Sequence, residues 1–291
     1  MNPVNIQYNQ TKILPGMATM LLMFFVPATS YAEKFNRAEV TKVVNDVRLL
    51  TGTKTSRPAS KGSVVSGNTA VRTGLKSRAQ MDFPDASIVR LGANSVFSFI
   101  QGQRDVDLEK GTILMQVPKS LGRTKIRTSS ISAAITGTTI LIEYVPPITK
   151  DAGEIITPGT FKAIVIEGSL ELELKDLPGQ TLILKAGEMV AFSTDIKVLP
   201  KKFVIDLGRL IKTSKLIEGG MGPLPHRPLM NREVEIQNKK KKEGRLVEVS
   251  AIRDPENLTS LPNNDINNVR EVENARRPNP PVQLPERPDR P

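Results

Sequence analysis

Few residues of this sequence belong to the types that usually carry out chemistry. The 291 residues include one histidine, His226, and no cysteine. A single imidazole without thiolates leaves only carboxylates from which to build a transition-metal site. The sequence also lacks the G-x-S-x-G turn that presents a nucleophilic serine, and Gly219-Gly220-Met221-Gly222 lacks the lysine of a phosphate-binding loop. We therefore expect no metal site and no cofactor.

Paired carboxylates are the catalytic possibility that remains, because the acidic groups of a glycoside hydrolase leave no local sequence signature. Glu167, Glu171 and Glu173 are close together in the sequence. The last two alternate with leucines, as residues on the solvent-facing side of a strand do. We interpret them as surface residues, and we expect that the protein is not an enzyme.

The charge balance is basic. Lys and Arg number 41 and Asp and Glu 30, a formal net charge of +11, so an anionic partner has to be considered. The sequence has no Trp, three Tyr and nine Phe, which leaves few aromatic side chains for stacking on bases, and it has no nucleic-acid recognition motif. We therefore do not expect nucleic acid as a partner.

The first 32 residues have the pattern of an export signal. A polar start with Lys12 is followed by an apolar centre from Met17 to Val26, and Ser30-Tyr31-Ala32 places small residues at a cleavage position. A retained membrane anchor is the alternative, but prolines and a glycine interrupt the segment, and a transmembrane helix needs about 20 strongly apolar residues. We expect a periplasmic, cell-surface or secreted protein that meets the membrane only transiently, through this segment.

Short strands dominate the middle of the chain. Between Ser63 and Thr194, brief apolar runs with period-two alternation are separated by glycines, and no segment has a helical period. Gly111, Gly168 and Gly187 each precede a new apolar run, which predicts a turn with positive φ or a bulge at each of them. The pattern is typical of a sandwich, a jelly roll or a β-solenoid. Before it, we expect one strand from Glu39 to Leu50 and a linker or long loop from Thr51 to Gly62.

The pattern changes to helical after Pro200. Apolar residues at three- and four-residue spacing predict a helix from Asp206 to Glu218, with Asp206 as its cap. Leu229 to Lys242 is expected to form a second helix. A hairpin is the alternative there, through Val234, Ile236, Val247 and Val249. Beyond Arg253 the chain is rich in Pro and Arg and has no apolar period, so we expect disorder.

One stretch of the β region resembles a known family. It contains Val71-Arg72-Thr73-Gly74, Ser77, Ala79, Met81, Phe83, Asp85-Ala86-Ser87, Val89-Arg90-Leu91-Gly92 and Asn94-Ser95. This series resembles the FecR domain, whose pattern reads V-x-T-G-x-x-S-x-A-x-L-x-F-x-D-G-S-x-V-x-L-x-x-N-S. Ala86 stands where the family has glycine, so a positive φ there would be strained.

We expect the motif residues to be mainly structural. They are Thr73, Gly74, Ser77, Phe83, Asp85, Ser87, Arg90, Leu91, Gly92, Asn94 and Ser95. Asn94 and Ser95 are expected to bond to local backbone. Strand alternation predicts that Ala79, Met81 and Phe83 are buried and that Arg78, Gln80 and Asp82 face solvent.

The resemblance implies a signal relay in which the β domain senses an outer-membrane receptor and a cytoplasmic head controls a sigma factor. Only twelve residues precede the apolar segment, so we do not expect that head or transfer sigma regulation to this chain. The expected function is an extracytoplasmic FecR-like module that binds or senses through an envelope protein or a cell-surface polymer. A structural or scaffold protein of the envelope is the alternative.

These inferences divide the chain into five parts. They are a signal peptide (1–32), a leading strand and linker (33–62), a FecR-like β domain (63–200), a helical C-terminal extension (201–252), and a disordered Pro/Arg-rich tail (253–291). The expected fold class is thus an all-β core followed by one or two short helices and the tail.

Cleavage after Ala32 gives the first testable prediction. N-terminal sequencing of the protein from the envelope fraction should begin at Glu33, because signal peptidase cuts after a small residue at this distance from the apolar centre. A full-length product in the cytoplasm would contradict the expected localisation.

Overall fold

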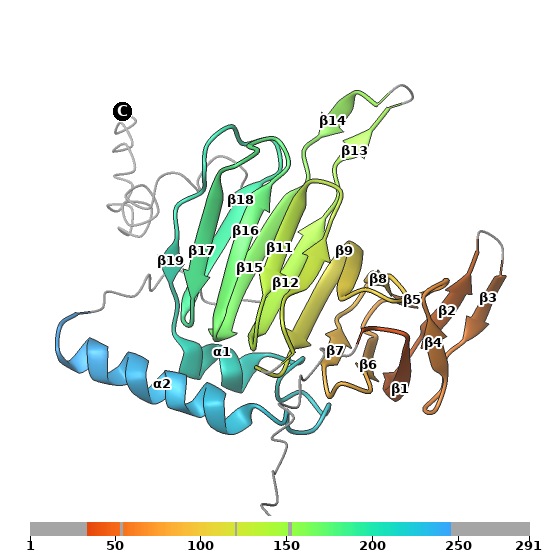
Figure 1. Ribbon diagram of the computed structural model, residues 1–291, viewed down its shortest axis with the longest axis horizontal. Coiled ribbons are helices and arrows are strands. Elements are labelled where there is room, and N and C mark those ends of the chain that lie inside the picture. Colours follow the sequence, from red (N-terminus) through yellow and green to blue (C-terminus); the bar gives the residue numbers. More distant parts are fainter. Residues whose placement is uncertain (1–33, 53–54, 120, 151–152, 246–291) are drawn as a thin grey trace, which may run out of the picture. The chain divides into compact units, whose positions relative to one another are not determined.

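Two β-sheets that share one long strand form the main body of the protein in the computed structural model, which describes residues 34–52, 55–119, 121–150 and 153–245. The first sheet runs through β4 (Val64–Ser66), β1 (Arg37–Val44), β6 (Arg78–Asp82), β7 (Ile88–Leu91), β9 (Asp105–Gln116), β12 (Thr139–Val145), β15 (Thr160–Glu167), β18 (Glu188–Ser193) and β19 (Phe203–Val204). The second sheet runs through β3 (Thr55–Pro58), β2 (Val47–Thr51), β5 (Thr69–Thr73), β8 (Val96–Phe99), β9, β10 (Thr124–Arg127), β11 (Ile131–Ile135), β16 (Ser169–Leu174) and β17 (Thr181–Lys185). All of these pairings are antiparallel except that of β9 with β10 (Figure 1).

Strand β9 joins the two sheets. Its first half pairs with β8 and β10, and its second half pairs with β7 and β12. Gly111 lies between the two halves with φ +94°, and a Cβ there would come within 2.4 Å of the Ser95 Cα. Only glycine combines this φ with so close an approach, so the strand can pass from one sheet to the other at this residue.

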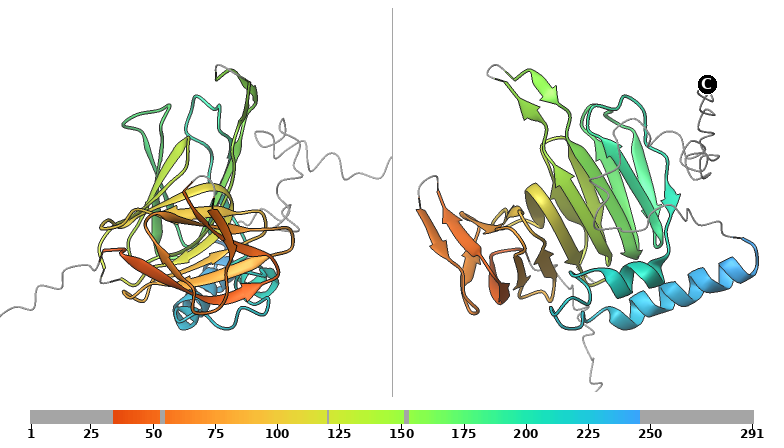
Figure 2. Two further views of the ribbon diagram at one scale, coloured as in Figure 1. Left: turned by 90° about the vertical axis from the view of Figure 1, so that its right-hand side faces the viewer. Right: turned by 180° about the vertical axis from the view of Figure 1, so that it is seen from behind.

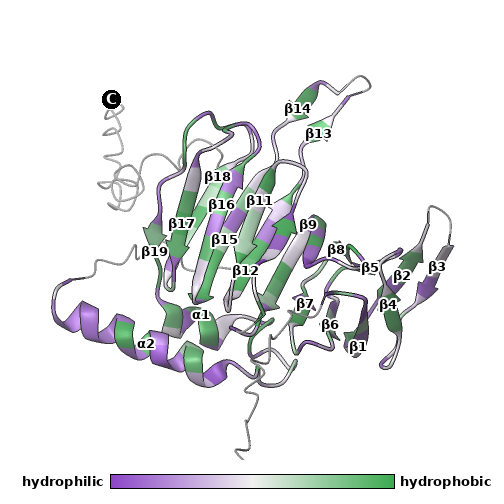
Figure 3. Ribbon diagram, viewed as in Figure 1, coloured by the Kyte–Doolittle hydropathy of each residue, from purple (hydrophilic) through white to green (hydrophobic). Residues whose placement is uncertain are grey.

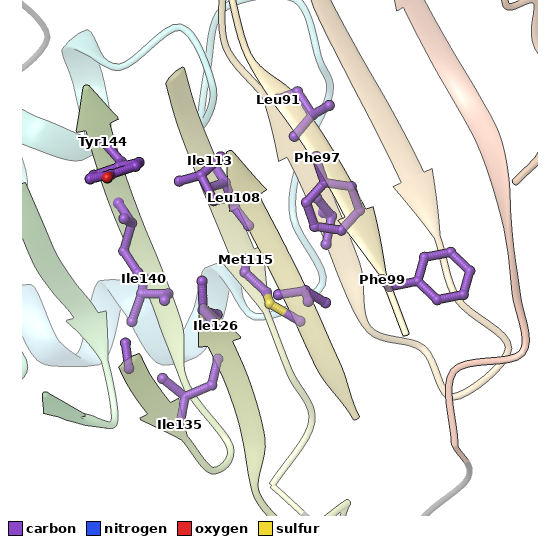
Figure 4. Packing of buried hydrophobic residues seen from close by; sticks show 14 of the residues in the cluster. Leu91, Phe97, Phe99, Leu108, Ile113, Met115, Ile126, Ile135, Ile140 and Tyr144 are labelled. Atoms are coloured by element: carbon purple, nitrogen blue, oxygen red, sulfur yellow. The ribbon is translucent and has the colours of Figure 1, made fainter. Parts of the chain in front are cut away.

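The main core fills the space between the two sheets. Alternate residues of each strand point inward, as strand geometry requires. Figure 4 shows Ile113, Met115 and Ile140 of the first sheet in one cluster with Phe97 and Leu108 of the second. The expected all-β fold is therefore confirmed as two layers around one core, and further views of them are given in Figure 2.

The positive φ predicted for the three glycines is confirmed: Gly111 lies beside an irregularity within β9, and the other two form turns. Gly168, between β15 and β16, has φ +86°, and Gly187, between β17 and β18, has φ +83°. At both places the chain crosses from one sheet to the other. Turns of this handedness favour glycine because it has no Cβ to clash with the backbone.

The leading segment differs from the sequence prediction. The single strand expected over Glu39 to Leu50 is wrong, because Asn45, with φ +58°, turns the chain between β1 and β2. The linker or loop expected from Thr51 to Gly62 is wrong as well, because it contains β3, which pairs with β2. Side chains on both β1 and β2, such as Val40 and Leu49, belong to the main core.

Two helices add a third layer on the outer face of the first sheet. Helix α1 (Leu207–Thr213) and helix α2 (Arg227–Lys242) follow β19. A second apolar cluster joins them to the sheet; it contains Ile88, Leu114, Leu141, Ile164, Ile166, Met189, Ile205, Leu207, Leu210, Ile211, Leu216, Ile217, Leu224 and Met230. Figure 3 shows apolar and hydrophilic residues interspersed along α2, as expected for a helix that packs on one side.

The helix predictions are confirmed with one correction. The Asp206 carboxylate caps α1 by accepting a hydrogen bond from Arg209 N at 2.8 Å. Helix α1 ends at Thr213, however, with Ser214 as its C-cap, and does not continue to Glu218. The hairpin alternative for the second segment is wrong, because Val234 and Ile236 lie inside α2.

Some features lie apart from these layers or outside the described residues. Strands β13 (Ile148–Thr149) and β14 (Ile155–Thr157) form a separate hairpin with exposed isoleucines. The expected signal segment and the tail from Arg253 fall outside the described residues. Within the part that is described, no helix is long and apolar enough to cross a membrane.

Candidate functional site

The sequence motif forms turns at both ends of β6 and β7: the β5–β6 and β7–β8 turns lie together at one end, and the β6–β7 turn lies at the other. Thr73 Oγ1 donates to Gly92 O at 2.5 Å and accepts from Ser95 N at 2.9 Å. Ser95 Oγ accepts from Thr112 N at 2.9 Å and lies 3.1 Å from Thr112 O. These side chains satisfy buried backbone groups in three neighbouring turns, so they fix the turns relative to one another.

A second pair of motif residues fixes the turn between β5 and β6. Ser77 is buried, and its Oγ accepts from Asp46 N at 3.0 Å and donates to Leu75 O at 3.1 Å. Asn94 adopts φ +54°, and its backbone N donates to Gly74 O at 3.1 Å. A Cβ on Gly74 would lie 2.9 Å from the Asp46 carboxylate, so a larger residue here would have to displace that side chain.

The third motif turn, between β6 and β7, contains strain. Ala86, which replaces the family's glycine, has φ +63°, a conformation that costs an alanine about 1 kcal/mol. The Asp85 carboxylate supports the turn by accepting from Ser87 N at 2.8 Å and from Ser87 Oγ at 3.0 Å. Phe83, just before the turn, packs against Phe35 with ring centroids 4.4 Å apart.

Arg90 is the motif residue with the most far-reaching contacts. It lies on the outer face of β7 and is fully buried. Its Nη1 donates to Leu216 O at 2.7 Å and to Ile217 O at 3.2 Å, and its Nη2 donates to Met221 O at 3.0 Å and to Gly222 O at 2.8 Å. The guanidinium thus holds the backbone of residues 214–222, which we call the anchored segment, on the first sheet.

Burial lowers the pKa of Arg90 to about 10, while the charges of Asp82 and Glu218 oppose the shift. The group therefore stays cationic at neutral pH. Among the described residues no carboxylate forms a hydrogen bond or ion pair with it, so its charge is balanced largely by carbonyl dipoles of the anchored segment.

Gln80 corrects the expected alternation of β6. Ala79, Met81 and Phe83 are buried as predicted, but Gln80 does not face solvent. Its Oε1 accepts from Arg90 Nε at 2.9 Å, and its Nε2 donates to Asp82 Oδ1 at 2.7 Å. The expectation failed because the anchored segment, which lies far along the chain, covers this face of the strand.

A groove opens where the motif turns meet the anchored segment. Its volume is about 560 Å³, and it is lined by Leu75, Lys76, Ser77, Arg78, Gly92, Ala93, Asn94, Thr112, Leu141, Glu143, Lys215 and Leu216. Gly92 lets the backbone pass close to Thr112 in the groove lining, because a Cβ at this position would lie only 3.0 Å from the Thr112 Cβ. The Glu143 carboxylate at the edge forms an ion pair with Lys162. This groove is the candidate functional site.

The residues that first suggested chemistry lie elsewhere. Glu167 is buried; its Oε2 lies 3.1 Å from His226 Nδ1, and its Oε1 lies 3.3 Å from Lys119 Nζ. This contact joins the start of α2 to β15. Glu173 is exposed and Glu171 pairs with Arg123 at 3.2 Å, which confirms their place on an outer strand face. Across the described ranges, no group of three or more His, Cys, Asp or Glu could hold a metal ion.

Sequence reasoning missed the groove itself. Leu75, Lys76 and Arg78 carry no motif, and Lys215 comes from the anchored segment, far away in the sequence. One signal was available in Arg90, because a cation inside the apolar run Ile88-Val89-Arg90-Leu91 has to find acceptors from another part of the fold.

Residues 69–171, from the start of β5 into β16, match the family model described as FecR protein, so this stretch is similar to that family. No curated protein matches the chain. The FecR match supports a signal-sensing regulatory module.

Two crystal structures with limited similarity are both described provisionally as an anti-sigma factor from Parabacteroides distasonis. One is 15% identical with a TM-score of 0.37, and the alignment covers 46% of this chain and 59% of the other. The second is 13% identical with a TM-score of 0.37, covering 50% of this chain and 73% of the other. The present chain thus spans less than two thirds of the length of the first of these proteins.

The contacts of Arg90 predict an order of stability among three variants. Gln80→Ala should lower the free energy of unfolding by about 1–3 kcal/mol, because it leaves Arg90 Nε buried without an acceptor. Arg90→Met should cost about 3 kcal/mol or more, because several carbonyls lose their donor at once. Arg72→Gln, at an exposed cation on β5, is the control and should cost almost nothing. Urea unfolding measures all three, and equal midpoints for Gln80→Ala and Arg72→Gln would contradict the assignment.

Proposed function

We propose that this protein is an extracytoplasmic FecR-like module that senses a signal by binding an envelope partner in the groove. The observation that carries the proposal is the position of the groove between the FecR motif turns and the anchored segment. A ligand there would touch two parts of the chain that Arg90 connects, so binding can be passed to the helical layer. The apolar segment before Ala32 supports a place outside the cytoplasm.

A non-catalytic role is part of this proposal. The motif side chains are used in backbone hydrogen bonds, and the buried Glu167 is paired with an imidazole and an ammonium group. These pairings leave the carboxylate engaged in structure. Binding, followed by a change in the helical layer, is the activity that this arrangement favours.

A structural or scaffold role in the envelope is the second candidate. It is favoured by the hairpin of β13 and β14, on which Ile148, Ile155 and Ile156 are exposed. Exposed apolar side chains grouped in this way are typical of a contact surface. A scaffold would use such a surface to bind a polymer or further copies of itself.

Site-specific photo-crosslinking in intact cells of the native host separates the two roles. A photoreactive residue with a small aliphatic diazirine side chain, which leaves the groove open, replaces Ala93 in the groove, Ile156 on the hairpin, or Lys61 as an exposed control. We expect one discrete protein adduct from position 93 and none from position 61. Purified partner identified from that adduct should bind the full chain, and Ala93→Trp should abolish binding by filling the groove. Adducts from position 156 alone, or a ladder of self-adducts, would contradict sensing at the groove and favour the scaffold.

A further inference from the structure

We infer that the groove takes a peptide segment of its partner that presents a carboxylate next to an apolar side chain, with the carboxylate on Arg78 and the apolar group on Leu75. The inference rests on the proposed function, because it names the chemistry of the partner at the same site. Its support comes from the charges of Lys76 and Arg78, the bonding of Arg78, the exposure of Leu75 and the residue types of the lining.

The charge of the lining favours an anion. Lys76, Arg78 and Lys215 line the groove together with one carboxylate, that of Glu143. Glu143 is already paired with Lys162, so its charge does little to cancel those of Lys76 and Arg78. The field inside the groove is therefore positive, and a negatively charged ligand gains from entering it.

Arg78 has donors that its surroundings leave unused. Its Nη2 makes one long hydrogen bond, to Gly219 O at 3.4 Å, and its Nε is buried and has no hydrogen-bond partner. Arg90, on the neighbouring strand β7, lies opposite Gln80, which is two residues along β6 from Arg78. In contrast to Arg78, Arg90 makes five hydrogen bonds. A buried N–H without an acceptor is costly. A small rotation of the Arg78 guanidinium would let a carboxylate accept from both nitrogens in the bidentate geometry that arginine favours.

Leu75 supplies the apolar contact. Its side chain is 74% exposed at the tip of the turn between β5 and β6. The turn is held in place, since Leu75 O accepts from Ser77 Oγ at 3.1 Å and Lys76 O accepts from Asn45 Nδ2 at 2.6 Å. A leucine displayed on a fixed backbone gives an incoming apolar side chain a contact with little loss of conformational entropy.

The residue types of the lining favour a peptide over an acidic glycan. None of the described residues that line the groove is aromatic, so a sugar ring would find no flat surface on which to stack. A volume of about 560 Å³ suits a few residues of an extended chain. The amide of Asn94 and the hydroxyl of Thr112 can bond to the backbone of such a chain.

The test uses the full chain and two terminally blocked probe peptides, Ac-Gly-Leu-Asp-Leu-Gly-amide and its Asn counterpart, with binding followed by NMR shift titration. We expect the Asp peptide to bind at the groove and the Asn peptide to bind about tenfold more weakly. Arg78→Gln and Leu75→Ser should each weaken binding of the Asp peptide about tenfold, the range of one charge-assisted hydrogen bond or one apolar contact. Arg78→Lys should retain more affinity than Arg78→Gln, because it keeps the positive charge. It should still bind more weakly than the original protein, because lysine cannot donate to both carboxylate oxygens as the planar guanidinium does. Lys125→Gln, an exposed lysine on β10 of the second sheet, is the matched control.

Equal affinity for the two peptides, or an unchanged affinity in Arg78→Gln, would overturn the inference. So would polygalacturonate binding at the groove in place of the peptide, which would identify an acidic glycan site. Unchanged urea midpoints of the variants would show that they fold. The crosslink from position 93 separates this inference from the proposed function: an adduct that persists in Arg78→Gln leaves sensing intact and rejects the acidic peptide, and no adduct even with Arg78 present rejects both.

Discussion

The buried guanidinium of Arg90 is the constraint on which the rest of the structure depends. A cation taken out of water needs acceptors in fixed places, and here Gln80 and four backbone carbonyls provide them. The carbonyls belong to the anchored segment, which follows α1 and has no regular structure of its own. Its course over the first sheet is set by the need to satisfy this one side chain. The far wall of the groove, with Lys215 and Leu216, results from that course.

The first sheet can accept this layer because its strands are apolar on both faces. Val89 and Leu91 point into the main core, while Ile88 and Arg90 point toward the helical layer. Where both faces of the sheet are covered, the turns at the ends of its strands provide the surface that is available for binding. The motif residues fix the conformation of those turns. At Ala86, whose φ is positive, the turn conformation is maintained at some cost in backbone strain.

Local patterns predicted those parts of the fold that depend on neighbouring residues. The turn glycines, the Asp206 cap and the second helix follow from short-range rules, and the structure confirms them. The division of the leading segment was also readable, since Asn45-Asp46 is a pair that favours turns. Gln80 could not be placed, because periodicity describes one strand and says nothing of a segment more than a hundred residues away that covers it. The groove has the same origin, since its two walls come from distant parts of the chain.

Hydrogen exchange of the full chain, compared with that of Arg90→Met, tests most directly whether Arg90 holds the anchored segment. Exchange should become faster in residues 214–222 and in α1, because their hold on the sheet is lost, while β9 and β12 stay as protected as before. Uniformly faster exchange would mean that Arg90 supports the whole core. Unchanged exchange in residues 214–222 would contradict the account, because something other than Arg90 would then hold the segment that forms the groove.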